Sequence, residues 1–456
     1  MLKEIKLKNF KLHRDTLLKF GKITLFIGPN NSGKSSAIHA MQVLKKEFVR
    51  HADKFIDVDL DHFDDLICHG ENFFEIKISG KIPLKNFLSL SELEIAKKFI
   101  DGDEVEVFST YIFRDGKFFP EHRIRFVTLG DQLKPGKFEI YTEDYAICWK
   151  RDSIGRSFKL LIEKNNSFEI FSKHGKINIG PVRMKLNRMH PSSLGYSDLP
   201  GGKKDDEILE LIYKVIQNIL SSPEHLIKSF HFVYPIRGLE WQGYDIEQNK
   251  ESSNLNLDNI SIEKRAKSVA NAFSYNRNLE DEIYERIKDV VDVKFFAELS
   301  SFNKIRLVSR ISKKVGIPFM FEGLGSHQML FMFVPIALAK PNETIFIEEP
   351  ENHLHPKAQY ELSKKFTEIA EKQEKQLVMT THSEHIVFGF LNMVAKKQLK
   401  KNDLKIYFFE NKDGEAKVKE LKVNEFGQVD GGLPGFFEAE VEGLLEFLGE
   451  PEEKGK

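Results

Sequence analysis

The fold is decided by residues 28–35, which read Gly28-Pro29-Asn30-Asn31-Ser32-Gly33-Lys34-Ser35. This stretch matches the phosphate-binding pattern G-x-x-x-x-G-K-[ST] at every fixed position. The short apolar run Ile23–Ile27 precedes it and predicts a buried strand, and an apolar-periodic helix is expected to begin at Ser35. A strand, a glycine-rich loop and a helix in this order predict a P-loop nucleotide-binding fold.

The chemistry expected of this loop follows from its residue types. Its glycines let successive backbone N–H groups point at phosphate oxygens, and the helix N-terminus adds to that attraction. We expect Lys34 to reach the β- and γ-phosphates of ATP and the Ser35 hydroxyl to bind Mg²⁺. All of residues 28–35 are therefore candidate nucleotide contacts. Ser36, the next residue, is included with them without an assigned role.

A second apolar strand is expected at Thr344-Ile345-Phe346-Ile347, and it ends in Glu348-Glu349-Pro350. Adjacent carboxylates at the end of a strand can reach different parts of one phosphate site. We assign Glu348 to Mg²⁺, through water, and Glu349 to the general base that polarises the attacking water.

A third apolar strand, Gln376–Met379, leads into Thr380-Thr381-His382-Ser383. His382 is predicted to be a catalytic residue that senses the γ-phosphate. The alternative is a structural histidine. A zinc site is a further alternative, because His353, His355, His382 and His385 could bind the metal if they converged.

Composition limits the class of protein. With 41% hydrophobic and 30% charged residues among 456, the chain is expected to fold and to be soluble. The formal charge of −1 gives no overall basic field for nucleic acid. Two cysteines cannot form a disulfide framework, which favours the cytoplasm. No apolar run approaches the roughly 18 residues of a membrane span, so no membrane association is expected.

The order of patterns along the chain predicts one nucleotide-binding fold that is split by insertions. The sequence from Phe73 to about Ile179 predicts mainly strands. Apolar residues at helical spacing recur over Ile208–Ile219, and Ser268–Leu299 is predicted to be mostly helical. A strand is expected at Leu404–Glu410. The predicted division is a nucleotide-binding core at 1–80 and 301–425, a β-rich insertion at 81–190, a helical lobe at 191–300 and a short tail at 426–456.

Three motifs carry a resemblance to a known family: GPNNSGKS at 28–35, EEPENHLHP at 348–356 and TTHS at 380–383. Together they resemble the ABC-type ATPases of the SMC-like and OLD (overcoming lysogenisation defect) groups. Lys8-Asn9-Phe10-Lys11 and Pro235-Ile236-Arg237 are also similar to those groups. The resemblance covers about residues 1–75 and 230–425. It implies an α/β P-loop NTPase of ABC-ATPase type, with a mixed or parallel core sheet and with β-rich and helical insertions.

The resemblance also implies a homodimer, or a higher even oligomer, in which each nucleotide is capped by the partner's signature segment. Gly323-Leu324-Gly325-Ser326-His327-Gln328 lies where that segment is expected. Ser326 and Gln328 are then candidate contacts in trans. The serine is displaced by one position from the usual Leu-Ser-Gly-Gly-Gln order, which leaves Ser326 and His327 both open as the phosphate contact. No glutamine fits the expected Q-loop, so hydrolysis is predicted to be slow or regulated.

OLD nucleases carry a C-terminal TOPRIM domain, and no D-x-D follows an apolar strand after Glu410. We therefore expect no nuclease in this chain. The tail, Val423–Leu448, contains Phe426-Gly427-Gln428-Val429-Asp430 and Leu433-Pro434-Gly435-Phe436-Phe437-Glu438. It resembles the short C-terminal region of stand-alone AAA-type ATPases of phage-defence operons (Septu-like or PARIS-like). This resemblance implies an ATP-driven switch acting on a separate effector such as a nuclease or toxin. The alternative is a DNA-repair or DNA-processing ATPase that clamps DNA, so DNA stays open as a partner. A transporter's cytoplasmic ATPase is a third, weaker reading.

Overall fold

The structure is a computed structural model. It describes residues 1–53, 63–97, 100–114, 117–128, 222–234, 262–300, 304–312 and 315–433, with short pieces at 145–146, 158–159, 168–172, 175–179, 185–186, 218 and 244–245. The chain forms two compact units. The first unit is Met1–Lys19 with Ser36–Phe230, and the second is Phe20–Ser35 with His231–Lys456.

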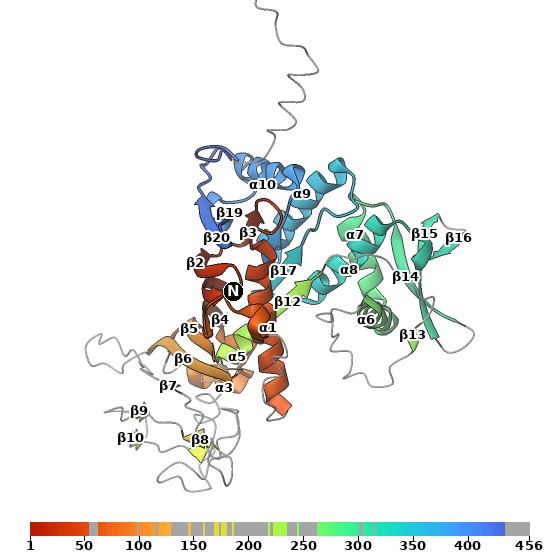
Figure 1. Cartoon of the computed structure of the whole chain (residues 1–456). Helices are drawn as coiled ribbons and strands as arrows, with labels where there is room; N and C mark the ends of the chain where they lie inside the picture. The colour runs from red at the N-terminus through yellow and green to blue at the C-terminus, as the bar shows by residue number, and fades with distance from the viewer. Residues whose placement is uncertain are drawn as a thin grey trace, which may run out of the picture. The chain divides into compact units, whose positions relative to one another are not determined.

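The second unit contains a six-stranded sheet in the order β12-β17-β18-β3-β19-β20 (Figure 1). Its strands are β12 (Phe230–Val233), β17 (Thr344–Glu348), β18 (Gln376–Thr380), β3 (Ile23–Ile27), β19 (Leu404–Lys412) and β20 (Glu415–Leu421). The four strands β17, β18, β3 and β19 run parallel, and β20 returns antiparallel to β19. The sheet is therefore mixed with a parallel centre, which confirms the predicted fold class.

The central strands form where the sequence has unbroken apolar runs. All five residues of β3 and all five of β18 are buried, as are the first four of β17. A strand covered on both faces has no polar side to alternate with, so it reads as continuously apolar. The predicted strands at Ile23–Ile27, Gln376–Met379 and Leu404–Glu410 are confirmed as β3, β18 and β19.

Three helices of this unit lead into or out of the central strands. The helix α8 (Leu324–Leu338) precedes β17, α9 (Pro356–Lys372) follows β17, and α10 (Glu384–Ala395) follows β18. In Figure 1, α9 and α10 lie side by side, and the Nδ2 of Asn392 donates to the hydroxyl of Tyr360 between them at 2.6 Å. The end of α8 is capped by the buried Lys375, whose Nζ donates to the carbonyl of Ile336 at 2.5 Å. This cap holds α8 against the strand β18 that Lys375 precedes.

A second, four-stranded sheet of the same unit has the order β13-β15-β14, with β16 paired to β15. Its strands are β13 (Tyr244–Asp245), β14 (Lys294–Leu299), β15 (Lys304–Ser312) and β16 (Val315–Pro318), followed by a short 3-10 turn, η5 (Phe319–Phe321). The helices α6 (Ile262–Tyr275) and α7 (Asn278–Ile287) confirm the helical spacing after Ser268. The prediction was wrong for the last residues of that stretch, because Lys294–Leu299 pair with β15 as a strand.

The first unit is built on an antiparallel sheet of the order β2-β1-β4-β5-β6-β7. The strands are β1 (Leu2–Phe10), β2 (His13–Lys19), β4 (Phe73–Pro83), β5 (Ile100–Arg114), β6 (Lys117–Thr128) and β7 (Tyr145–Ala146). Among the described residues, two short antiparallel pairs also belong to this unit: β8 (Phe158–Lys159) with β11 (Lys185–Leu186), and β9 (Phe168–Ser172) with β10 (Gly175–Ile179). The predicted β-rich character after Phe73 is confirmed over these residues.

The other described helices are one long helix, α1 (Lys34–Asp53), and several short ones. The helix α1 begins one residue before its predicted start. The others are α2 (Phe63–Leu66), α3 (Leu90–Ala96), α5 (Ser222–Lys228) and the 3-10 turns η1 (Leu84–Asn86) and η6 (Lys401–Asp403). Most of the helix expected at Ile208–Ile219 lies outside the described residues. None of the described helices has the length and apolarity needed to cross a membrane.

The two units cut across the division drawn from the sequence, since residues 36–80 group with 81–230. The boundaries of a nucleotide-binding core and its insertions stay a prediction. The segments that carry the candidate site residues 28–35, 348–349 and 382 all belong to the second unit, so its sheet alone positions them.

Candidate functional site

The loop that follows β3 has a backbone shape that only some residues permit. Gly28 and Gly33 have φ of 134° and 100°, and Asn31 has φ of 58°. A β-carbon at Gly28 would lie 2.1 Å from the carbonyl oxygen of Phe409 on the neighbouring strand β19, so no side chain fits there. Turns of this kind aim successive N–H groups into one concavity, which makes an anion-binding nest. The loop is thus shaped for phosphate.

Lys34 closes over this loop at the first residue of α1. Its Nζ donates to the carbonyls of Gly28 and Pro29, at 2.8 and 2.7 Å, and the side chain is 5% exposed. Burial lowers the pKa of Lys34 to about 8, against the opposing charges of Glu349 and Glu351. The hydroxyl of Ser32 is buried and has no hydrogen-bond partner among the described residues. A cation, a nest of donors and an unpartnered hydroxyl suit a polyphosphate.

The acidic pair follows at the end of the neighbouring parallel strand β17. Glu348 is its last residue and is half-buried, and Glu349 comes directly after it with φ of 47°. A glutamate in the left-handed region is uncommon and costs backbone free energy. It is held there by its N–H, which donates to the carbonyl of Thr380 at 3.1 Å, and by its Oε2, which accepts from Asn352 Nδ2 at 2.8 Å. Glu349 is therefore fixed at both backbone and carboxylate.

A third carboxylate, Glu351, lies two residues further along and was missed by the sequence reasoning. Its side chain is 8% exposed, and its Oε1 accepts from the backbone N–H of His382 at 2.6 Å. The Oε2 has no hydrogen-bond partner among the described residues. Burial raises the pKa of Glu351, and the hydrogen bond from His382 opposes that shift. The only signal in the sequence is the acid-rich run Glu348-Glu349-Pro350-Glu351, which does not distinguish a buried acid from an exposed one.

His382 lies on the loop between β18 and α10, with its side chain exposed. Burial of part of the ring lowers the pKa of His382, the charge of Lys34 lowers it further, and Glu349 opposes both. Lys34 and Glu349 therefore lie close enough to His382 for their charges to affect its pKa. The three residues follow the adjacent parallel strands β3, β17 and β18, whose carboxyl ends meet at one edge of the sheet.

The loops that carry Glu349 and His382 are also joined by Gln359 of α9. Its Oε1 accepts from the hydroxyl of Ser383 at 2.6 Å, and its Nε2 donates to the carbonyl of Leu354 at 2.8 Å. The Ser383 hydroxyl in turn accepts from the N–H of Ile386 and caps α10. The loop after β17 and the loop after β18 thus form one braced structure.

The proposed signature segment begins α8, with Gly323 as its N-cap. His327 points into its own unit, because its Nε2 bonds the carbonyl of Phe319 at 2.6 Å and its ring packs against Phe319. Gln328 is fully buried, so a contact with a second copy's nucleotide would require its exposure. Ser326, 9% exposed in the first turn of the helix, is the better placed of the open candidates. No nucleotide contact of these three residues is tested by a single chain.

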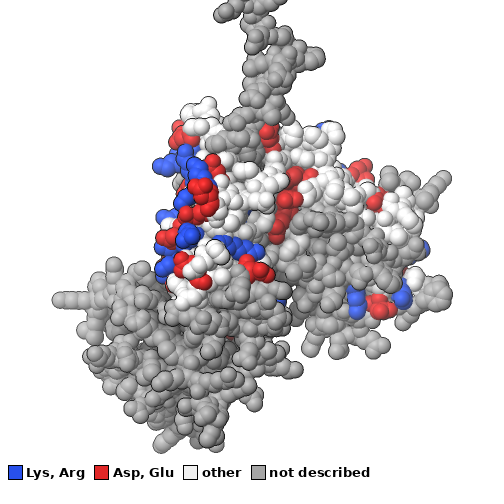
Figure 2. Space-filling model, viewed as in Figure 1, with Lys and Arg blue, Asp and Glu red and all other residues white. Residues whose placement is uncertain are grey.

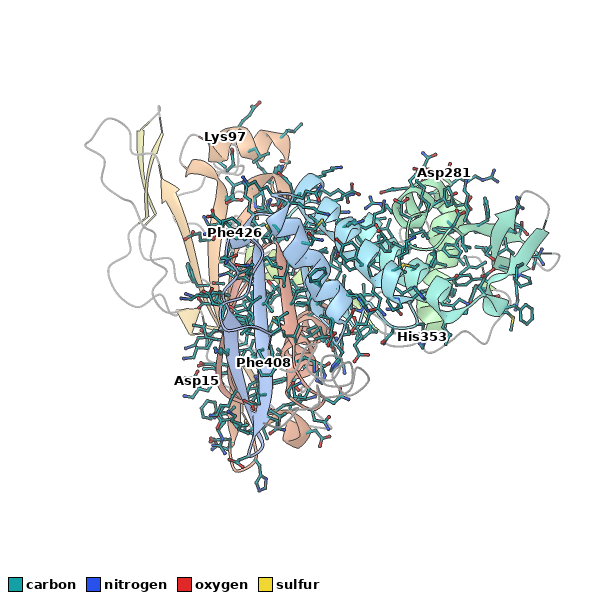
Figure 3. All side chains as sticks on the ribbon, turned by 90° about the horizontal axis from the view of Figure 1, so that it is seen from above. Asp15, Lys97, Asp281, His353, Phe408 and Phe426 are labelled. Carbon is teal, nitrogen blue, oxygen red and sulfur yellow. The ribbon has the colours of Figure 1, made fainter. Side chains whose placement is uncertain are left out.

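The start of α8 contacts the loop after β17 within the same unit. A β-carbon at Gly325 would lie 2.8 Å from the carbonyl oxygen of His353 and 3.3 Å from a methyl carbon of Leu354. Figure 3 labels His353 on this loop. The start of α8 and the loop after β17 therefore pack closely enough that a β-carbon at Gly325 would require one of them to shift.

The histidines considered for zinc are arranged differently from a metal site. The Nδ1 of His355 accepts from the N–H of Lys357 as the N-cap of α9. Among the residues that the structure describes, no group of three or more His, Cys, Asp or Glu side chains is placed to hold a metal ion. The zinc alternative gains no support from the geometry.

Residues 1–387 match the model of a protein family described as an AAA ATPase domain. The chain belongs to this family. Residues 399–446 match a second family model, described as a protein of unknown function (DUF3696). No curated protein matches the chain.

Three solved structures are similar to this AAA ATPase domain protein. One is an SMC head bound to the C-winged helix domain of ScpA, with 13% identity and a TM-score of 0.44 over 93% of this chain and 98% of that chain. Another is the SMC head domain from Thermotoga maritima, with 12% identity and a TM-score of 0.39 over 92% of this chain and 99% of that chain. The third is an Smc head domain with an extended coiled coil bound to the C-terminal domain of ScpA, derived from Pyrococcus furiosus, with 12% identity and a TM-score of 0.40 over 98% of this chain and 99% of that chain. Values this low support no conclusion about this chain.

An ATPase domain requires groups for both nucleotide and Mg²⁺, and the residues present fit them. Hard cations such as Mg²⁺ take oxygen ligands. Ser35, the second residue of α1, is exposed, and Glu348 is the last residue of β17 in the same unit. When bound, Mg²⁺ would neutralise phosphate charge that Lys34 alone leaves unbalanced. Ser36 follows in α1 with a half-buried side chain, and nothing in the structure gives it a role.

Proposed function

We propose that the chain binds ATP with Mg²⁺ on residues 28–35 and hydrolyses it with Glu349 as the general base. The observation that carries this proposal is the placement of Lys34, Glu349 and His382 after the carboxyl ends of the adjacent parallel strands β3, β17 and β18. Ligands of open α/β sheets bind at the carboxyl ends of the strands, which is where these three residues lie. Membership of the AAA ATPase domain family supports the same chemistry.

Each side chain has a distinct task in this proposal. Lys34 and the loop N–H groups hold the phosphates, while Ser35 and Glu348 hold Mg²⁺. Glu349 accepts a proton from the attacking water, and its fixed backbone and its bond from Asn352 keep the carboxylate in one direction. His382 orients the terminal phosphate. A general base that is held in place at a positioned site typically contributes about 10²–10⁴-fold to a rate.

The nucleotide is proposed to be enclosed between two copies of the chain, with Ser326 of one copy facing residues 28–35 of the other. The sequence resemblance to ABC-type ATPases supports this arrangement. The position of Ser326 in the first turn of α8 is consistent with it, because a helix N-terminus attracts anions. ATP then acts as the ligand that joins two copies, and hydrolysis separates them.

The biological use proposed for this cycle is a switch that controls a separate effector, such as a nuclease or toxin, in defence against phage. The resemblance of the tail, Val423–Leu448, to the C-terminal region of stand-alone ATPases in phage-defence operons supports it. DNA clamping is the competing use. Figure 2 shows Lys and Arg interspersed with Asp and Glu on the viewed face, and on β19 and β20 Lys405 pairs with Glu420 and Lys417 with Glu415. These pairs leave little net positive charge on that hairpin for DNA.

The proposal is tested by the mass of the purified chain carrying Glu349→Gln, with and without ATP. A doubling of mass with ATP is expected, because the variant binds ATP and lacks the base for the hydrolysis that would separate the two copies. Repeating the measurement with products of neighbouring genes and with DNA separates the two uses. A stable assembly with a neighbour's product supports the effector switch, and loading onto DNA alone supports DNA clamping.

A further inference from the structure

We infer that Glu351 is a positioning residue, whose carboxylate fixes the backbone of His382 and thereby the direction of the imidazole. This inference rests on the proposed ATP hydrolysis. Glu351 itself is not placed to act on substrate, since it is 8% exposed and one of its oxygens is already occupied by the His382 N–H. A buried carboxylate is costly unless it is hydrogen-bonded, so this bond has a large effect on the loop.

The backbone around His382 is held by hydrogen bonds at His382 itself and at both of its neighbours. The His382 N–H donates to Glu351, and the next residue, Ser383, is held through its hydroxyl by Gln359. Thr381, on the other side, accepts from the N–H of Ser383 at 2.9 Å and hydrogen-bonds to the carbonyl of Phe26 on β3. The backbone is thus fixed on both sides of His382. Glu351 supplies the contact at His382 itself.

The same residue links two parts of the proposed reaction. Glu351 is two residues from Glu349, whose position depends on the carbonyl of Thr380. The bond from Glu351 to His382 spans the same two loops in the opposite direction, 31 residues apart in the chain. Any shift of the loop after β17 therefore displaces the candidate base and the candidate phosphate-sensing histidine together.

Two conservative variants distinguish the effect of side-chain length from the effect of side-chain charge at position 351. Glu351→Gln keeps an oxygen at the same distance from the His382 N–H and removes the charge. Glu351→Asp keeps the charge and withdraws the oxygen by about one methylene group. We expect Gln to retain most of the wild-type kcat and Asp to lower kcat about tenfold to a hundredfold, with KM for ATP nearly unchanged. The reverse order, with Asp active and Gln inactive, would overturn the inference in favour of a charge-dependent role.

A double variant distinguishes positioning from a general structural effect. If Glu351 acts through His382, then Glu351→Asp has no further effect on kcat in the His382→Ala background. Equal losses in both backgrounds would mean that Glu351 stabilises the site in another way. Glu368→Asp, the same substitution on an exposed part of α9, is the matched control and should leave kcat unchanged.

Hydrogen exchange gives a readout that does not depend on turnover. The amides of residues 380–386 should exchange faster in Glu351→Asp than in the wild type, and at the wild-type rate in Glu351→Gln. If the wild-type chain releases no phosphate from ATP, the proposed hydrolysis fails, while this exchange difference still tests the tie between Glu351 and His382. Unchanged exchange in Glu351→Asp would refute the tie.

Discussion

The charge of Lys34 depends directly on the fold. Burial lowers its pKa to about 8, and the carboxylates of Glu349 and Glu351 prevent a larger shift. In the free protein the ammonium is therefore mostly charged at pH 7 and mostly neutral at pH 9. The terminal phosphate of a nucleotide is fully ionised across this range, since its second pKa is about 6.

We predict that affinity for ATP falls about tenfold between pH 7 and pH 9, because only the protonated Lys34 neutralises phosphate and its charged fraction falls by that factor. Equilibrium binding of ATP at a series of pH values measures this. Lys34→Arg is the control, because a guanidinium stays charged above pH 12. An equally steep decrease in the Arg variant would show that another group titrates.

Much of the residue-level site was predictable because its motifs are continuous in the chain. Residues 28–35, Glu348-Glu349 and His382 each follow an apolar run that marks a central strand, and the structure brings Lys34, Glu349 and His382 together. Glu351 was not predictable. Its importance comes from a hydrogen bond to His382 across two loops, and a glutamate near a proline ordinarily indicates an exposed turn.

At the scale of elements, the close contact between α8 and the loop after β17 is the most easily tested feature. A β-carbon at Gly325 would meet the carbonyl of His353 at 2.8 Å, and a backbone atom cannot move aside as a flexible side chain can. Replacing a helical glycine by alanine otherwise stabilises a helix by about 1 kcal/mol. Overpacking typically costs about 1–3 kcal/mol, so the two effects oppose each other.

We predict that Gly325→Ala lowers the free energy of unfolding by about 1 kcal/mol, the difference between the overpacking cost and the gain in helix propensity. Denaturant titration of the variant and the wild type measures the change. Gly316→Ala is a control in the same unit, since a β-carbon there meets only the Nε of Arg310, at 3.9 Å. If Gly325→Ala raised the free energy of unfolding, the loop at His353 would have to move away from the new methyl group at little cost.

The elements themselves could be predicted unevenly from the sequence. The strands β3, β18 and β19 were correctly predicted because buried parallel strands are continuously apolar. The strand β14 was assigned to a helix, because a short run such as Lys294–Leu299 has no clear period, and its pairing with β15 is a tertiary property. The contact of α8 with the loop at His353 could not be predicted from the sequence, where its only trace is the glycine at position 325.

In the proposed dimer, two copies of the chain share each nucleotide. Variants of Lys34 and Ser326 test this when they are mixed. Lys34→Ala removes the phosphate contact in one copy, and Ser326→Arg blocks the signature segment of the other. A mixed dimer then contains one intact site, formed by the loop of the Ser326→Arg copy and the α8 of the Lys34→Ala copy.

We predict that each variant alone is inactive and that an equimolar mixture recovers about a quarter of the wild-type rate, because half of the dimers are mixed and each has one of two sites intact. Phosphate release before and after mixing measures the recovery. No recovery, despite confirmed exchange of copies, would place Ser326 outside the partner's site.

Residues 28–35, Glu349 and His382 are proposed to form a site that hydrolyses ATP, and steady-state phosphate release from Mg²⁺ and ATP measures this activity. The wild-type chain is predicted to release phosphate, even if slowly. Glu349→Gln is predicted to bind ATP with similar affinity and to release phosphate about 100-fold more slowly or less, since the fixed carboxylate is the proposed proton acceptor. Equal rates in the two proteins would contradict the account, because hydrolysis would then proceed without its proposed base.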